Sequence, residues 1–276
     1  MAYVVQLTDF LESVTPEVLG AIQCPSCRSE THLESNDDSL QCPQCGLGYP
    51  FRQGYLDLLP HYEERITPIQ HLLQFKPAIL LYDNIWRPAG YFLTSGRSFS
   101  TDLVGITKLM APERHRLVLD LACGPGNFTR SVARCDERIQ VVGFDLARGM
   151  LERAGHLTAQ EEFPNVQYMR GSALSLPFRS GVFDGVICCG ALQLFTDYDR
   201  SLAEISRVLK VGGEFVCQTI VGPKPAPLWL DMADRLMKFG HFKMDEFKRQ
   251  LNELQLNILD EELSRASFIF RAAKAS

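Results

Sequence analysis

Short apolar runs alternate with longer, partly polar segments through the second half of the chain. Apolar runs bounded by glycine or polar residues predict buried strands, and apolar residues spaced three and four positions apart predict helices. We predict strands near 117–121, 139–144, 166–169, 183–189 and 213–219. We predict helices near 127–135, 147–161 and 198–209. Strands and helices that alternate in this order are typical of a parallel, doubly wound α/β sheet.

The pattern is less regular on both sides of this core. Beyond the fifth strand it predicts helices near 228–238 and 245–254, then strands near 256–261 and 267–273. Before the core, residues 61–111 read as helices interrupted by prolines. Close to the N-terminus, the spacing of Phe10, Leu11 and Val14 predicts a short amphipathic helix that packs on the body of the protein.

Composition limits the classes of protein that fit. The 276 residues are 46% hydrophobic and carry a net charge of −5, which suits one large domain with a small additional unit. The acidic balance gives no general attraction to nucleic-acid phosphates, although it is compatible with a local basic patch. No apolar run approaches the roughly 20 residues that span a bilayer. The N-terminal residues lack a basic region followed by an apolar one, so we expect no secretory signal. Nine cysteines fit a reducing compartment, so we expect a cytoplasmic protein.

Four of the cysteines form two Cys-Pro-x-Cys pairs, with fourteen residues between the pairs. The two pairs supply Cys24, Cys27, Cys42 and Cys45. Two such turns can present four thiolates to one Zn²⁺, with the polar segment between them folded as a small hairpin. Four protein ligands close the coordination sphere, so the site is expected to be structural. The alternatives are a module that has its cysteines but holds no metal, and redox-active cysteine pairs.

A glycine turn follows the first core strand. Residues 117–121 lead into Gly124 and Gly126, and a helix can begin at Asn127. Strand, glycine turn and helix start together form a cradle that a nucleotide can approach closely. The dinucleotide fingerprint requires a third glycine where Thr129 stands, and no phosphate-loop lysine follows. An acid at the end of the second strand, Asp145, is placed to accept hydrogen bonds from ribose hydroxyls.

Further motifs follow in order at residues 170–178, 183–189 and 209–215. Together with the glycine turn they resemble the class I S-adenosylmethionine-dependent methyltransferases, and are most similar to the ubiquinone and menaquinone biosynthesis type. The resemblance covers residues 112–220. It implies a seven-stranded, Rossmann-like sheet whose last two strands form an antiparallel pair at the edge. It also implies S-adenosylmethionine as methyl donor and S-adenosylhomocysteine as product.

The resemblance also implies roles for individual residues. Gly124 and Gly126 would let the backbone approach the methionine part of the donor, and Asp120 would hold its ammonium group. Asp145 would bind the ribose, with Leu146 beside the adenine. The donor-binding residues expected in full are Asp120, Ala122, Gly124, Gly126, Asp145, Leu146, Ser172, Ala173, Cys189 and Gly190.

Two positions depart from the family pattern. Ser172 stands where the family commonly has an aspartate that binds the adenine amine, which weakens side-chain recognition there. Gln193 stands where quinone-type relatives often have histidine, so a general base is absent from that position. The candidates for a catalytic role are His61, His71, Tyr82 and Gln193. The candidates for contact with substrate, mostly aromatic residues of the segment before the core, are Tyr82, Trp86, Tyr91, Phe92 and Gln193.

The cysteine-rich segment carries a second resemblance. A tail with Gly54, Tyr55, Leu58, Leu59 and Pro60 follows the cysteines. Cysteine pairs with such a tail are similar to the N-terminal part of the ribosomal RNA guanine-N1 methyltransferases, in which the metal module helps to hold RNA. This segment carries two arginines and five acidic residues. That charge balance is unfavourable for binding phosphates.

These observations divide the chain into an N-terminal arm with a zinc module (1–61), a helical cap (62–111) and a methyltransferase domain (112–276). The expected function is methyl transfer from S-adenosylmethionine to a small, apolar or aromatic molecule. One alternative is a base methyltransferase of ribosomal or transfer RNA. The second alternative is a non-catalytic protein that binds S-adenosylmethionine and interacts with a partner. No membrane span is expected, and the oligomeric state is left open.

Overall fold

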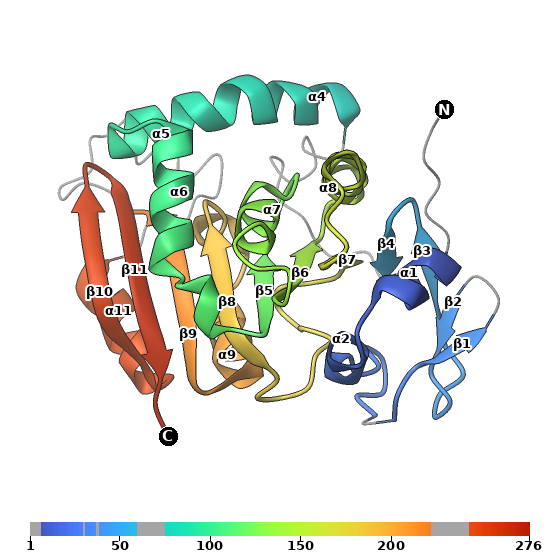
Figure 1. Cartoon of the computed structure of the whole chain (residues 1–276). Helices are drawn as coiled ribbons and strands as arrows, with labels where there is room; N and C mark the ends of the chain where they lie inside the picture. Colours follow the sequence, from blue (N-terminus) through green and yellow to red (C-terminus); the bar gives the residue numbers. More distant parts are fainter. Residues whose placement is uncertain (1–6, 30, 37–38, 60–74, 222–242) are drawn as a thin grey trace.

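The fold is described from a computed structural model, which covers residues 7–29, 31–36, 39–59, 75–221 and 243–276 (Figure 1). One twisted sheet runs through the molecule and has helices on both faces (Figure 1). Its core strands are β5 (Leu117–Leu121), β6 (Gln140–Asp145), β7 (Val166–Arg170), β8 (Phe183–Cys189), β9 (Leu209–Ile220), β10 (Leu256–Ser264) and β11 (Ser267–Lys274). They lie in the order β7-β6-β5-β8-β9-β11-β10.

The predicted fold class is confirmed. Strands β5 to β9 pair in parallel, and β11 pairs antiparallel with both β9 and β10. The described part of the chain nevertheless forms eleven strands in one sheet rather than seven. The four additional strands are β1 (Glu34–Asn36), β2 (Ser39–Gln41), β3 (Gly48–Arg52) and β4 (Tyr55–Asp57). They extend the sheet because β4 pairs in parallel with the edge strand β7, where backbone N–H and C=O groups would otherwise be unpaired.

Each face of the sheet has its own apolar core. On one face lie α6 (Phe99–Leu109) and α7 (Asn127–Ala133), packed on Val118, Val141 and Ile187, and α8 (Arg148–Glu161), packed on Cys123 and Tyr168. On the other lie α2 (Pro16–Ala21), α9 (Tyr198–Val208) and α11 (Met244–Glu253), packed on Leu119, Val142 and Val186. Neighbouring residues of each strand therefore face opposite cores, which explains the continuous apolar runs.

Outside the cap region, the other described short helices are α1 (Leu7–Ser13), η2 (Pro112–Arg114) and η3 (Leu192–Leu194). Most elements begin and end within a few residues of their predicted bounds. The fifth strand, β9, is longer than predicted and begins at Leu209. The helix predicted near 228–238 lies outside the described residues. Among the described helices, none combines the length and the apolar character required to cross a membrane.

Helices of the cap region cross beyond the carboxyl ends of the core strands (Figure 1). They are α4 (Lys76–Leu81), the π-helical turn η1 (Tyr82–Trp86) and α5 (Arg87–Ser95), followed by α6. The π-helical turn ends two residues before Pro88, which lacks the N–H needed for a regular helical bond. Asp83 in this turn accepts from Asn127 Nδ2 at 3.1 Å and from Arg153 Nε at 3.2 Å. The cap is thereby tied to α7 and α8.

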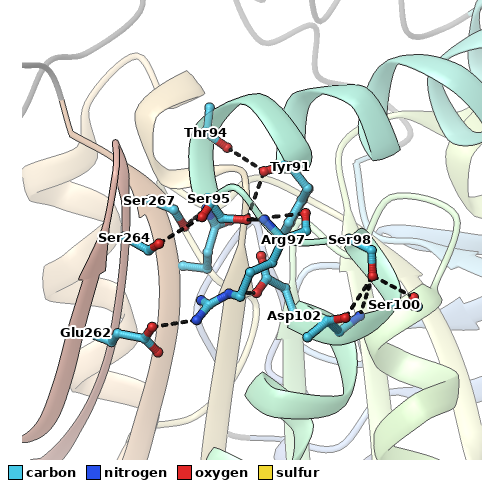
Figure 2. A network of polar contacts seen from close by, with 12 residues as sticks. Tyr91, Thr94, Ser95, Arg97, Ser98, Ser100, Asp102, Glu262, Ser264 and Ser267 are labelled. Carbon is cyan, nitrogen blue, oxygen red and sulfur yellow. Dashed lines mark hydrogen bonds and ion pairs between the residues drawn. The ribbon is translucent and has the colours of Figure 1, made fainter.

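The other end of the cap is tied to the edge of the sheet (Figure 2). Ser264 donates to the carbonyl of Ser95 at 2.8 Å, and the N–H of Ala266 donates to Thr94 O at 2.9 Å. These bonds occupy carbonyl groups that the last turn of α5 leaves unpaired. Arg97 lies between Asp102, at 2.6 Å, and Glu262 of β10 (Figure 2). The turn between β10 and β11 therefore caps the C-terminal end of α5.

Candidate active site

A cavity lies at the carboxyl ends of β5, β6 and β8, beneath the cap. It encloses about 1040 Å³, its open mouth included. Eight of the ten residues expected to bind the donor line it, namely Asp120, Ala122, Gly124, Asp145, Leu146, Ala173, Cys189 and Gly190. Parallel strands place their carboxyl ends at one edge of the sheet, which brings these residues together from four separate loops.

The glycine turn has the backbone that its sequence requires. Gly124 has φ +54° and Gly126 has φ +76°, both in the left-handed region that favours glycine. A Cβ on Gly124 would lie 2.9 Å from Nη2 of Arg87. A Cβ on Gly126 would lie only 2.3 Å from the hydroxyl oxygen of Tyr168. Gly126 therefore makes room for the core beneath the turn, and it does not line the cavity.

Asp145 joins the two loops of the cavity floor. One carboxylate oxygen, Oδ2, accepts from the N–H of Gly124 at 2.8 Å, and the other, Oδ1, accepts from the N–H of Ala147 at 2.8 Å. Burial raises the pKa of Asp145, and the bonds from the N–H groups of Ala147 and Gly124 act in the opposite direction. Each oxygen has a second lone pair, so the carboxylate can also accept hydrogen bonds from a ligand.

Asp120 is the second acid of the cavity. Its side chain is buried, and Oδ2 accepts from the hydroxyl of Thr129 at 2.5 Å. Burial raises the pKa of Asp120 to about 7, although the bonds from Thr129 favour the ionised form. The carboxyl group is therefore poised between its two forms near neutral pH and ionises readily when a cation approaches.

Arg87 is a cavity residue that the sequence analysis missed. Its guanidinium lies 5.0 Å from the centre of the Tyr82 ring and 5.5 Å from that of Phe99. Its Nε is buried and has no hydrogen-bond partner. The available signal was an arginine immediately before Pro88 in an aromatic segment, which by sequence alone is indistinguishable from a surface arginine.

The other expected site residues lie in different places. Ser172 is buried outside the cavity lining, where its hydroxyl accepts from the N–H of Leu174 at 3.1 Å. Gln193 is also buried outside the lining, and its amide joins Gly190 O and Thr219 Oγ1 at 3.1 and 3.0 Å. Both ends of that amide are thus occupied by the protein. His61 and His71 lie outside the described residues.

The aromatic residues of the cap divide into two groups. Tyr82 lines the cavity. Tyr91 is buried and does not line the cavity, but its hydroxyl lies 3.6 Å from the position that a Cβ on the lining residue Gly190 would take. Trp86 and Phe92 are 45% and 56% exposed and do not line the cavity. Two of the four aromatic candidates therefore lie at the site and two on the outer surface of the cap.

The four cysteines of the N-terminal pairs come together in one cluster. Their sulfur atoms all lie within 4.8 Å of one another. Cys24 and Cys45 are 3.6 Å apart, and Cys27 and Cys42 are 3.7 Å apart. Four thiolates at about 2.3 Å from one Zn²⁺ would be about 3.8 Å from each other, so the cluster fits a tetrahedral zinc ion.

Hydrogen bonding prepares one of these thiols for a metal. Burial raises the pKa of Cys24, but the N–H of Cys27 and the hydroxyl of Tyr49 outweigh it and lower the pKa to about 6. The Tyr49 oxygen lies 3.1 Å from the sulfur. Zinc binds thiolates rather than thiols, and the lowered pKa of Cys24 favours that form, whereas burial and the neighbouring cysteines raise the pKa of Cys27 and of Cys45. The predicted hairpin between the two pairs is present as β1 and β2.

Comparisons with known proteins agree with this geometry. Residues 118–213 match the methyltransferase domain family. The chain is 27% identical over 248 residues to the uncharacterized methyltransferase At2g41040, chloroplastic, of Arabidopsis thaliana, which covers 85% of this chain and 70% of that protein. It is 39% identical over 101 residues to the demethylmenaquinone methyltransferase of Lactococcus lactis, which covers 36% of this chain and 40% of that enzyme.

Solved structures share the fold. The phosphoethanolamine N-methyltransferase 2 of Haemonchus contortus, in complex with S-adenosyl-L-methionine, is similar with a TM-score of 0.63 at 17% identity, over 78% of this chain and 62% of that chain. A putative methyltransferase from Bacillus halodurans is similar with a TM-score of 0.56 at 20% identity, over 64% of this chain and all of that chain.

The sheet, the acid-lined cavity and the matched domain define a class I S-adenosylmethionine-dependent methyltransferase. The protein is thus an enzyme that uses S-adenosylmethionine, with relatives among the quinone-type methyltransferases. The expected cytoplasmic location stays a prediction, because one relative is named as chloroplastic.

The buried carboxyl group of Asp120 predicts a pH dependence of donor binding. If Asp120 holds the donor ammonium, as the resemblance implies, protonation of its carboxylate below about pH 7 should weaken S-adenosylhomocysteine binding by up to about tenfold per pH unit. Affinity should rise with pH and level off above the pKa. Calorimetric titration between about pH 5.5 and 8 measures this. In Asp120→Asn the dependence should vanish, and a wild-type affinity that is flat across this range contradicts the assignment.

Proposed function

We propose that the protein transfers the methyl group of S-adenosylmethionine to a small, apolar or aromatic molecule. The observation that carries the proposal is the character of the cavity beyond Gly190. There the lining continues with Ala191, Leu194 and Phe195, and Phe128 and Met150 also face the space. Among the lining residues, Arg87 is the only one with a positively charged side chain, and it lies against the glycine turn. An apolar lining of this kind can bind a flat apolar acceptor, and it offers few positively charged groups that could bind phosphates.

The donor is proposed to bind through charge complementarity. S-adenosylmethionine carries a sulfonium, an ammonium and a carboxylate, and the cavity offers two carboxylates and one guanidinium. Asp145 would receive the ribose hydroxyls, and Asp120 would receive the ammonium. Arg87 would hold the donor carboxylate, since its buried Nε lacks a partner and its Nη2 lies over Gly124. The net charge of the site is opposite to that of the donor, and S-adenosylhomocysteine, which has lost the sulfonium, would leave more easily.

The chemistry is proposed to depend on alignment rather than on a protein base. The sulfonium already activates the methyl group, so the enzyme chiefly holds donor and acceptor in line. Burial raises the pKa of Cys189 well above its usual range, which leaves it a neutral thiol. Gln193 is engaged at both ends of its amide. The acceptor would therefore supply its own nucleophilic atom.

The N-terminal module is proposed to hold a structural zinc ion through its four cysteines. Its two arginines are exposed but are engaged by other groups of the protein. Arg28 donates to the carbonyl of Leu176 at 2.8 Å, and Arg52 lies 3.7 Å from Asp57. Arginines that are already engaged within the protein offer fewer free N–H groups to phosphates, so the module favours a small-molecule acceptor over the RNA alternative.

The acceptor class can be tested by following the methyl group. With labelled S-adenosylmethionine, label should enter organic-soluble quinols or phenols, and the product should survive RNase. Phe195→Ser should lower kcat/KM for the acceptor by about tenfold and leave donor affinity unchanged. Leu259→Ser, an exposed position on β10, is the matched control and should behave as wild type. Label that enters acid-precipitable, RNase-sensitive material instead would establish the RNA alternative.

Arg87 can be tested by comparing two ligands. Arg87→Gln should weaken S-adenosylhomocysteine binding by at least about tenfold, as expected for a lost charge-assisted bond. Binding of 5′-methylthioadenosine, which has no amino acid carboxylate, should change less than about twofold. Arg134→Gln removes an arginine that stacks on Phe163 at 5.3 Å and should alter neither affinity. Equal losses for both ligands would mean that Arg87 does not hold the carboxylate.

The zinc proposal predicts one Zn²⁺ per purified chain. Chelation, or Cys45→Ser, should lower the free energy of unfolding by about 2–4 kcal/mol because a metal cross-link is lost. Cys135→Ser is the matched control, since Cys135 is an exposed cysteine outside the cluster. Elemental analysis and thermal unfolding measure both effects. A metal-free protein whose stability is unchanged by Cys45→Ser would refute the site.

A further inference from the structure

The N-terminal module contributes a strand to the side of the sheet that holds the donor cavity. Strand β4 pairs in parallel with β7, with Leu56 opposite Met169 and Asp57 opposite Arg170. Leu56 faces the core beneath the opposite face of the sheet. Because side chains alternate along a strand, Tyr55 and Asp57 face the α8 side, where the cavity acids also lie.

Asp57 is a fully buried carboxylate with no part in the proposed zinc site. Its Oδ1 accepts from Arg170 Nη1 at 2.9 Å and from the N–H of Leu59 at 3.1 Å. Its Oδ2 is buried without a hydrogen bond. The nearest charges to Oδ2 are Arg52 at 3.7 Å and Arg148 at 3.8 Å. A buried charge is retained only where compensating charges surround it, and here the compensation comes chiefly from the catalytic domain.

Two of these arginines, Arg170 and Arg148, lie next to the loop that follows Asp145. Arg170 donates through Nε to the carbonyl of Leu146 at 3.0 Å. Arg148 is the first residue of α8, directly after that loop. Asp57 is therefore connected through Arg170 to the beginning of the loop, and it lies 3.8 Å from the arginine at the end of the loop. Within the loop the N–H of Ala147 donates to Asp145, so the direction of the Asp145 carboxylate depends on where the loop lies.

Apolar contacts reinforce the same connection. Tyr55 is buried in one cluster with Cys123 of the glycine turn and with Tyr168. Gly54 and Gly155 approach closely, since a Cβ on Gly155 would lie 3.7 Å from the Cα of Gly54. The turn between β3 and β4 thus packs directly on α8. The module supports both loops that meet at Asp145.

We propose that Asp57 is a positioning residue for donor binding. Through Arg170 and Arg148 it fixes the loop that aims Asp145 at the donor ribose, so the affinity for the donor depends on the N-terminal module. This inference rests on the proposed role of Asp145. It assigns the module a part in the catalytic cycle without any contact between module and substrate.

The test is donor binding to the full-length zinc-loaded chain with Asp57→Asn, which keeps the shape of the side chain and removes its charge. S-adenosylhomocysteine and 5′-methylthioadenosine should both bind about tenfold more weakly, by the same factor, because the perturbed group holds the ribose that they share. Asp136→Asn is the matched control. Asp136 pairs with Arg138 at 2.6 Å on the surface, and its loss should leave both affinities unchanged.

Arg170→Lys tests the same connection independently, and it also serves if Asp57→Asn does not fold. Lysine keeps a positive charge beside Asp57 but lacks the planar fork that also reaches Leu146 O. It should weaken both ligands by about fivefold or more. Circular dichroism at the titration temperature establishes that each variant is folded. A folded variant with wild-type affinity for both ligands overturns the proposal, even if its melting temperature falls.

Zinc release gives a second readout that does not depend on activity. Coupling between two sites is reciprocal, so S-adenosylhomocysteine should slow the loss of zinc to a chromogenic chelator in the wild type. In Asp57→Asn this protection should be reduced at least about fivefold. Protection that is equal in both proteins counts against the proposal. A wild-type chain that binds neither ligand would instead refute the donor site itself, which separates the two failures.

Discussion

The carboxylate of Asp145 holds the site together. Its two oxygens accept from the N–H groups of Gly124 and Ala147, which belong to the loops after β5 and after β6. An unpaired carboxylate buried at this position would be costly, and two backbone donors reduce that cost while they fix its orientation. The glycine turn and the loop before α8 consequently keep one relative arrangement. The other features of the site are arranged around this bond pair.

The edges of the sheet stabilise opposite sides of this arrangement. On one edge β4 supports the loop after β6 through Asp57 and Arg170. On the other edge, the turn between β10 and β11 caps α5 and so holds the cap over the cavity (Figure 2). Open sheets leave unpaired backbone groups along their edge strands. Strand β4 pairs with β7 and so covers that edge of the core sheet, whereas β10 stays an edge strand and supports the cap through the turn that follows it.

Some polar and charged groups of the cavity lack partners within the protein and would be paired by a bound ligand. Asp120 lies in a buried position that raises its pKa to about 7, and Arg87 has a buried nitrogen without a partner. In native proteins, buried polar groups without hydrogen-bond partners and buried acids with raised pKa values are uncommon, and they are typical of sites that bind a ligand. The proposed donor has groups of the required sign for each. Affinity and orientation would then come from the same contacts, as in-line transfer requires.

Much of this protein follows from local sequence. Alternating apolar runs predict the strands and helices of the core, because burial on both sheet faces requires continuous apolar residues. The glycine turn, Asp120, Asp145 and the four cysteines are also evident, because backbone shape and ligand chemistry restrict those positions to few residue types. The roles proposed for Arg87 and Asp57 rest on the tertiary structure alone. Arg87 lies far along the chain from Gly124, and Asp57 lies far from Arg148 and Arg170. An arginine or aspartate has the same local signature whether it is buried at a site or exposed to solvent.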